Sequence, residues 1–96
     1  MATFILLSTL TDEGAKTITS HPLRIKEVNQ ELERMGARVV SQWAVLGPYD
    51  FVNVVEAPDV QTIARISAEL VSRGTVRIMT LAAIPVDEFI ASLSQR

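Results

Sequence analysis

Six residues of this chain could bind or transform a small molecule, and most of them lie in or near the segment 47–50. They are of types that stack on, hydrogen-bond to or exchange protons with a ligand: Tyr49, Asp50, Asn53, Trp43, Arg77 and His21. A phenol beside a carboxylate can orient or protonate a bound molecule. An amide or a guanidinium can hold a carbonyl oxygen or an anion, and an indole can stack on a flat ring. We take these six as candidate ligand-binding residues and assign no catalytic residue.

The corner, residues 47–50 in the stretch LGPYDFVNVVEAPD, has two interpretations. In the structural one, Pro48 fixes the backbone of a four-residue turn and the Asp50 carboxylate accepts hydrogen bonds from nearby backbone amides. In the functional one, Tyr49 and Asp50 stand at the mouth of a cavity formed by the sheet. The structural interpretation is preferred, because such a turn favours glycine, proline and aspartate, and the functional one stays open.

The polar residues inside otherwise apolar strands are Ser8, Gln42, Asn53, Arg77 and Thr80. Asn53 and Arg77 have specific interpretations. Asn53 lies between Val52 and Val54, and a buried amide without a partner would cost about 1 to 3 kcal/mol. Asn53 therefore either fixes the register of a dimer or faces a ligand inside a barrel. Arg77 either holds an anionic ligand or pairs with Glu56 or with an acidic group of a second copy, and pairing is preferred.

Trp43 and His21 also have competing interpretations. Trp43 packs in the core or in an interface, or it stacks on a flat ligand. His21 precedes Pro22 at the expected start of a helix, where it caps the helix or is exposed, and the alternative is a general base active near neutral pH. The chain has one histidine and no cysteine, which leaves no ligand triad for a metal. We expect neither a metal nor a cofactor.

Composition indicates an ordinary globular domain. The 96 residues suffice for one hydrophobic core, so residues 1–96 are expected to form a single domain. Apolar residues make up 48% and charged residues 21%, the net charge is −2, and the basic residues are scattered. This balance does not suit a nucleic-acid-binding surface. The first apolar run ends after Leu10 and is too short for a signal core or a membrane span. We therefore expect a cytoplasmic protein without nucleic-acid or membrane partners.

The hydrophobic pattern predicts four strands and two helices. The strands are expected at residues 3–9, 38–46, 51–56 and 76–84, and the helices at 22–35 and 59–73. Apolar residues recur at helical spacing in both helices, and Gly36 and Gly74 follow their ends. Ser20 or His21 is expected near the cap of the first helix, and the Asp59 carboxylate can accept from the free amides at the start of the second. Residues 11–21, with Gly14 and polar side chains, are expected to form a loop or a single helical turn, and the residues from 85 onward a short amphipathic tail.

The order of these elements is β-α-β, a hairpin, then β-α-β. The segments MGARVV and RGTVRI repeat the same junction of helix, glycine and strand. Two right-handed crossovers of this kind predict a ferredoxin-like α+β fold, in which a four-stranded antiparallel sheet carries both helices on one face. The first and third strands should be innermost, since they are the most continuously apolar.

The other face of the sheet is also expected to be apolar. Burying one large apolar side chain is worth roughly 1.5 to 3 kcal/mol, so a bare face of this kind favours association. We expect a homodimer whose sheets pack face to face as a dimeric α/β barrel. The alternative is a monomer whose C-terminal tail caps the sheet.

The sequence also resembles the GYD domain family of small, mostly uncharacterised proteins. The resemblance covers nearly the whole chain and depends on the opening FILLSTLTDEG, the corner residues Gly47, Tyr49 and Asp50, the junction EAPD and the final RGTVRIMTLAAI. It implies a ferredoxin-like fold with dimeric barrel relatives, and no known activity. Thr75 and Ala82 replace the asparagine and arginine usual in the family's last strand, so a ligand role for those groups is not expected here.

Two hypotheses about function remain. In the first, the chain is a homo-oligomeric module that binds a small molecule or a protein at the sheet face. In the second, it is a cofactor-independent barrel enzyme, such as a monooxygenase, isomerase or lyase, that acts on a small carbonyl compound. The second requires the polar candidates to converge in one cavity beside the corner. The sequence leaves open whether any reaction is catalysed.

Overall fold

The structure, a computed structural model, describes residues 1–94 and contains four strands and four helices in these residues. In chain order they are β1 (Ala2–Leu10), α1 (Asp12–Ser20), α2 (Arg24–Arg34), β2 (Arg38–Ala44), β3 (Phe51–Ala57), α3 (Val60–Ser72), β4 (Val76–Ala83) and α4 (Val86–Ser94). The four predicted strands and the two predicted helices, α2 and α3, are all present. The helices α1 and α4 were not predicted as such.

The four strands form one sheet in the order β2-β3-β1-β4, and every neighbouring pair is antiparallel. The inner strands are β3 and β1, which carry the most continuous apolar runs. The register pairs Leu6 of β1 with Asn53 of β3 and with Thr80 of β4. A bulge between Val39 and Ser41 shifts the pairing of β2 with β3.

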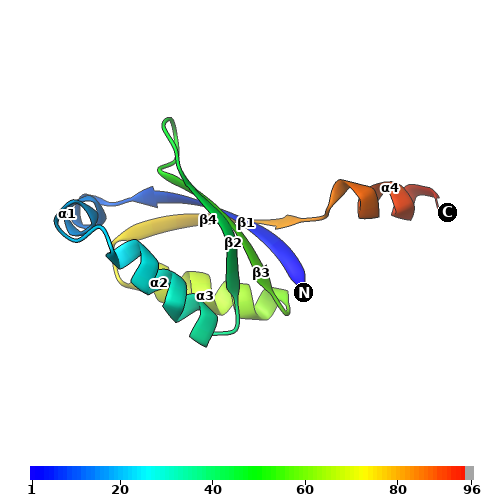
Figure 1. The fold of residues 1–96 in the computed structure, drawn as a ribbon, viewed down its shortest axis with the longest axis horizontal. Helices are drawn as coiled ribbons and strands as arrows, with labels where there is room; N and C mark the ends of the chain where they lie inside the picture. The colour runs from blue at the N-terminus through cyan, green and yellow to red at the C-terminus, as the bar shows by residue number, and fades with distance from the viewer. Residues whose placement is uncertain (95–96) are drawn as a thin grey trace.

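Helices α2 and α3 cover one face of this sheet, here called the helix face (Figure 1). The core lies between them and the inner strands, and its fully buried members are Phe4, Leu6, Leu32, Ala37, Val55, Ala57, Ile63, Ile66 and Leu70. The alternation along β1 and β3 places every second side chain in this core. The three buried residues of α3 recur at helical spacing, as the sequence predicted.

Helix α3 begins at the aspartate that the sequence identified as its cap. The Asp59 carboxylate accepts hydrogen bonds from the backbone amide of Thr62 at 2.8 Å and from its hydroxyl at 2.7 Å. These bonds lower the pKa of Asp59. The cap satisfies a donor of the first turn that would otherwise lack a partner.

Residues 12–20, expected as part of a loop or a single turn, form the nine-residue helix α1. Thr11 caps it, because its hydroxyl oxygen accepts from the Gly14 amide at 3.1 Å and its own O–H donates to the Gly74 carbonyl at 2.7 Å. Gly14 is buried, and a Cβ at this position would stand 2.0 Å from the carbonyl oxygen of Thr75. The glycine that suggested a loop instead allows α1 to pack closely on the start of β4.

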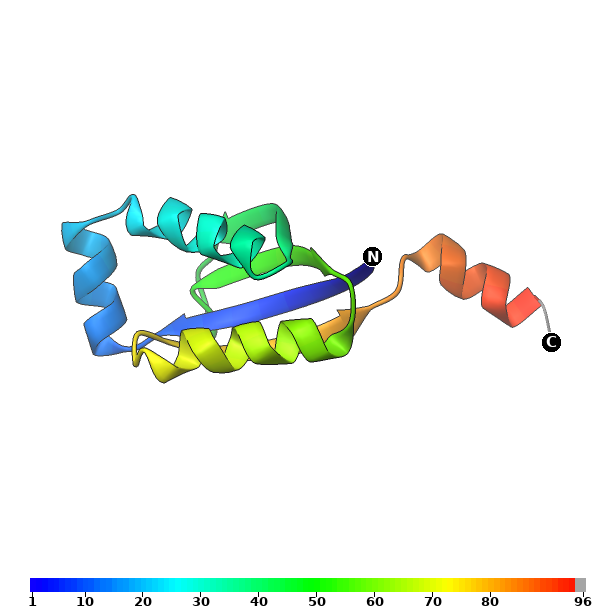
Figure 2. The same ribbon diagram turned by 90° about the horizontal axis from the view of Figure 1, so that it is seen from below.

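Figure 2 shows α1 lying across one end of the molecule, between the end of β1 and the start of α2. His21 is the C-cap of α1, and its backbone N–H donates to the Thr17 carbonyl. Helix α2 begins after Leu23 without a side-chain cap, so the prediction that Ser20 or His21 caps it is wrong. His21 is exposed, which agrees with the other structural interpretation of this residue. The extra helix moves His21 into the connection between α1 and α2.

Helix α4 projects from the opposite end of the sheet, away from the rest of the chain (Figures 1 and 2). None of its residues is buried. The alternative in which the C-terminal tail caps the sheet of its own chain is therefore wrong. Within residues 1–94, no helix is both long enough and apolar enough to cross a membrane.

Candidate functional site

The face of the sheet opposite α2 and α3, here called the open face, carries two apolar rows. In one row the cross-strand neighbours are Trp43, Val52, Leu7 and Met79, and in the next they are Ser41, Val54, Ile5 and Leu81. Trp43, Met79 and Leu81 are 62%, 51% and 42% exposed. The sequence predicted this second apolar face, and the structure leaves it uncovered by any element of the described chain.

Charged groups lie at the two ends of the open face. At one end, Arg38 and Glu56 form an ion pair across β2 and β3 at 2.5 Å. At the other end, Arg77 is exposed beside Thr9 of the neighbouring strand. The predicted pairing of Arg77 with Glu56 is wrong, because the antiparallel register places the two residues at opposite ends of the sheet.

Asp50 acts in the fold of the corner. Its carboxylate accepts from the Leu10 amide at 2.8 Å, and its backbone N–H donates to the Ser8 carbonyl at 2.8 Å. Its carbonyl accepts from the Val45 amide at 2.9 Å, and Gly47 has a φ of 116°, which favours glycine. The corner therefore ties the hairpin of β2 and β3 to the end of β1. These contacts support the structural interpretation of Asp50.

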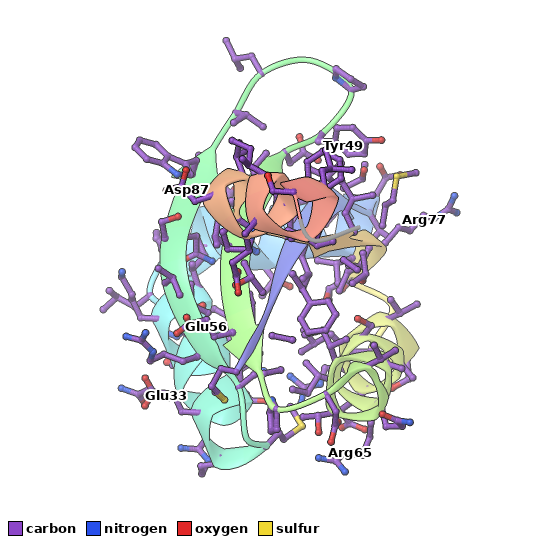
Figure 3. The ribbon with its side chains drawn as sticks, turned by 90° about the vertical axis from the view of Figure 1, so that its right-hand side faces the viewer. Glu33, Tyr49, Glu56, Arg65, Arg77 and Asp87 are labelled. Atoms are coloured by element: carbon purple, nitrogen blue, oxygen red, sulfur yellow. The ribbon has the colours of Figure 1, made fainter. Side chains whose placement is uncertain are left out.

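Tyr49 lies beside Arg77 in a small hollow on the open side of the sheet. The hollow is lined by Leu7, Thr9, Tyr49, Arg77, Ile78 and Met79. The Tyr49 hydroxyl lies 3.6 Å from the Met79 sulfur. Figure 3 shows Tyr49 and Arg77 on the side away from α2 and α3, whereas Glu33 and Arg65 lie on those two helices. Two of the six candidates therefore meet at a shallow, mainly apolar surface.

Asn53 does not lie on the open face. Its cross-strand neighbour is the buried Leu6, and its side chain faces the helices rather than a space between two sheets. Its Oδ1 atom is the buried side-chain acceptor that lacks a partner within residues 1–94. The expectation that Asn53 faces the inside of a barrel between sheets is therefore wrong about the side of the sheet.

His21 lies far from this set in the fold. Its Nε2 is 2.9 Å from Glu27 Oε2 at the exposed start of α2. The hydrogen bonds from His21 and Arg24 lower the pKa of the Glu27 carboxyl. The six candidates thus separate into four places: Tyr49, Arg77 and Trp43 on the open face, Asp50 in the corner bonded to β1, Asn53 under the helices, and His21 at the α1–α2 connection. They do not form the convergent set that acid–base catalysis requires.

Sequence reasoning missed two contacts between segments far apart in the chain. Asn29 of α2 and Gln42 of β2 form a reciprocal amide pair, with N···O distances of 2.9 and 3.3 Å. Glu31 of α2 accepts from Arg24 at 3.0 Å and from Arg73, which follows α3, at 2.6 Å. Neither pair has a local sequence signal. Within residues 1–94, no three side chains of metal-binding type are grouped as ligands.

Solved structures place this fold among known α+β domains. The crystal structure of TTHA0845 from Thermus thermophilus aligns with 88% of this chain and 95% of its own, with a TM-score of 0.59 and 23% sequence identity. This likeness shows the fold alone. It agrees with a small domain built on a four-stranded antiparallel sheet.

The chain belongs to the GYD domain family, whose model matches residues 4–93. The family assignment made from the corner and its flanking segments is thereby confirmed. A Thermus thermophilus protein named glutamine synthetase and cystathionine beta-lyase binding protein is 67% identical over 94 residues, which cover 97% of this chain and 99% of the relative.

Proposed function

We propose that this chain is a protein-binding module that works as a homodimer and has no catalytic activity of its own. The observation that carries this proposal is the amount of apolar surface that the fold leaves uncovered, on the open face and on α4. Monomeric proteins rarely expose large contiguous apolar patches unless the patches bind something. The candidate chemical groups, by contrast, are scattered.

The open face is proposed to pack against the open face of a second copy. The strand order β2-β3-β1-β4 with both crossover helices on one face supports a ferredoxin-like arrangement, and two such sheets packed face to face would form a dimeric α/β barrel. The centre of the open face is apolar and its charges lie at the ends, a distribution that suits a self-complementary interface. Trp43 then becomes an interface residue, and Arg77 can meet an acidic group of the second copy.

Helix α4 is proposed to contact the enzyme partner. Val86, Phe89, Ile90 and Leu93 are 69%, 49%, 54% and 49% exposed. Their spacing of three, one and three residues puts them on one side of the helix. Anchors with this spacing are those by which an amphipathic helix binds a hydrophobic groove of another protein.

The name of the close relative supports protein partners of a particular kind. At 67% identity over nearly the full length of both chains, we expect the two proteins to share most of the surfaces that matter for binding. We propose glutamine synthetase and cystathionine beta-lyase as the first partners to test, and the cytoplasm as the place where this chain would meet such enzymes.

The dimer is tested with Leu81→Lys on the open face and Val71→Lys on α3, a matched pair because both residues are 42% exposed. Burying an unpaired lysine opposes association. Light scattering coupled to size exclusion at micromolar concentration should give twice the chain mass for wild type and Val71→Lys and the chain mass for Leu81→Lys. A wild-type protein that elutes as a monomer would refute the proposed dimer.

Partner binding is tested with Phe89→Asp, using Ser92→Asp, also on α4, as the control. Surface plasmon resonance with the two purified Thermus enzymes should show binding by wild type and Ser92→Asp and a loss of at least about tenfold for Phe89→Asp. Light scattering should show that Phe89→Asp remains a dimer. If neither enzyme binds wild type, the partner proposal is wrong; if Phe89→Asp breaks the dimer, α4 belongs to the interface between copies instead.

A further inference from the structure

A cavity of about 220 Å³ lies between the helix face of the sheet and the helices α1, α2 and α3. Most of its lining is apolar and includes Leu6, Leu10, Ile18, Val28, Phe51 and Ile78. Because the cavity is on the side of the sheet opposite the open face, the proposed dimer would leave it in place. The inference below does not depend on the protein-binding proposal.

Most polar side chains around the cavity already have partners. Asn29 and Gln42 bond to each other. Arg24 and Arg73, which also line the cavity, both pair with Glu31. These groups satisfy one another, so they do not require a charged ligand.

Asn53 and Ser8 are the polar groups that the two inner strands, β3 and β1, contribute to the lining. Asn53 is only partly buried although its strand is central and its side chain lies under the helices. Its accessible part therefore faces the cavity, whereas its Oδ1 is itself buried and has no partner within residues 1–94. A half-turn of the carboxamide about its last side-chain bond exchanges Oδ1 with the Nδ2 group. A carboxamide can both donate and accept hydrogen bonds, and a buried one normally has partners.

The size of the cavity limits which molecule could bond to the Asn53 carboxamide. A dry cavity of roughly 150 Å³ lined by Leu, Ile and Phe binds benzene. A cavity of about 220 Å³ can hold one ring with one or two small substituents, or a branched aliphatic chain of similar bulk.

We propose that this cavity is a binding site for a small, uncharged, mainly apolar molecule with a single hydroxyl, which exchanges a hydrogen bond with the Asn53 carboxamide. The apolar wall provides the affinity through burial, and Asn53 provides the selectivity. A molecule of the same shape without the hydroxyl would leave the amide unpartnered.

Phenol and benzene are the matched probes, because they differ by the hydroxyl alone. Isothermal titration of the full chain should show that phenol binds about tenfold more tightly than benzene, the effect of one buried hydrogen bond. In Asn53→Leu, which keeps the side-chain volume and removes the amide, this preference should vanish. Trp43→Ala, on the open face, should leave it unchanged, and circular dichroism should verify that both variants are folded.

Three outcomes would overturn the proposal. In the first, wild type binds neither probe at millimolar concentration. In the second, wild type binds phenol and benzene equally, a result that is decided by the wild-type protein alone. In the third, a folded Asn53→Leu keeps the preference for phenol, or Trp43→Ala removes it, which would place the ligand elsewhere.

Discussion

Gly14 shows how one residue type can serve a different purpose from the one its sequence context suggests. In the segment TDEGAK it reads as a loop former, yet it lies inside α1 with its Cα against the backbone of Thr75. Asn53 is a second case: its position in β3 was evident, but the face of the sheet to which it points determines which ligand it can meet. Asp50 is a third, since its carboxylate bonds to the Leu10 amide rather than remaining available.

At the scale of single residues, we predict that Gly14→Ala destabilises the protein. Alanine is favoured over glycine inside a helix by about 1 kcal/mol. Its Cβ, however, would stand 2.0 Å from the Thr75 carbonyl oxygen, so backbone has to move. Because the clash is with backbone, the cost should lie in the upper part of the usual overpacking range, at about 2 to 3 kcal/mol, and the net loss in the free energy of unfolding should be about 1 to 2 kcal/mol.

Urea denaturation followed by circular dichroism measures that loss. Lys16→Ala, at an exposed position of the same helix, is the control and should change the free energy of unfolding by less than about 0.5 kcal/mol. A more stable Gly14→Ala would show that α1 does not pack closely on β4.

At the scale of elements, α2 and α3 lie on the same face and are joined by ion pairs at one end. Glu31 of α2 binds Arg73, just beyond the end of α3, and Arg24 on its own helix. Its side chain is 20% exposed, which makes these pairs stronger than ordinary surface pairs. The hydrogen bond from Arg73 is the main cause of the lowered pKa of Glu31.

We therefore predict that Glu31→Gln costs on the order of 1 kcal/mol of stability at pH 7. A carboxyl with a lowered pKa in the folded state stabilises the fold above its unfolded pKa, near 4.5, and this contribution is lost as the pH falls through the lower folded value. The difference between wild type and variant should thus be constant from pH 7 to about pH 5 and shrink below pH 4.5. Thermal unfolding across this pH range measures it.

Glu33→Gln, at an exposed position of α2, serves as the control and should behave as wild type throughout. A difference for Glu31→Gln that persists undiminished at about pH 2 to 3 would mean that the ionised carboxylate is not responsible.

At the scale of the whole molecule, the distribution of apolar surface matters more than any single site. One face of the sheet is packed under helices, the other is open, and α4 extends free of the body. A chain of 96 residues has little stability to spare. Burying the open face against a second copy is therefore expected to contribute much of the stability of the folded protein.

This expectation predicts a melting temperature that depends on protein concentration. If two folded chains associate and unfolded chains do not, a tenfold rise in concentration adds about 0.7 kcal/mol per chain at the transition. For a domain of this size that corresponds to a rise on the order of 3 to 5 °C. Differential scanning calorimetry at about 10 and 100 μM measures it.

In that experiment Leu81→Lys should melt at one temperature at both concentrations, because it no longer associates. A wild-type melting temperature that also stays constant would contradict dimer-linked folding.

The sequence by itself determined the four strands, the two helices that cover the sheet, and the family. Alternating apolar residues predicted the four strands, helical spacing predicted α2 and α3, and Asp59 predicted the start of α3, all of which the structure confirms. Each of these features depends on residues within about one helical turn or one strand of each other. Their types and spacing are therefore enough to predict the secondary structure.

Only the tertiary structure decided which of these residues meet. It placed Gly14 against Thr75, paired Glu56 with Arg38 instead of Arg77, and turned Asn53 toward a cavity under the helices. It also showed that α4 projects away from the sheet, although the sequence allowed this helix to cap the open face. Such contacts join residues far apart in sequence, and they are set by strand register and by the fit of packed side chains, which no local pattern records.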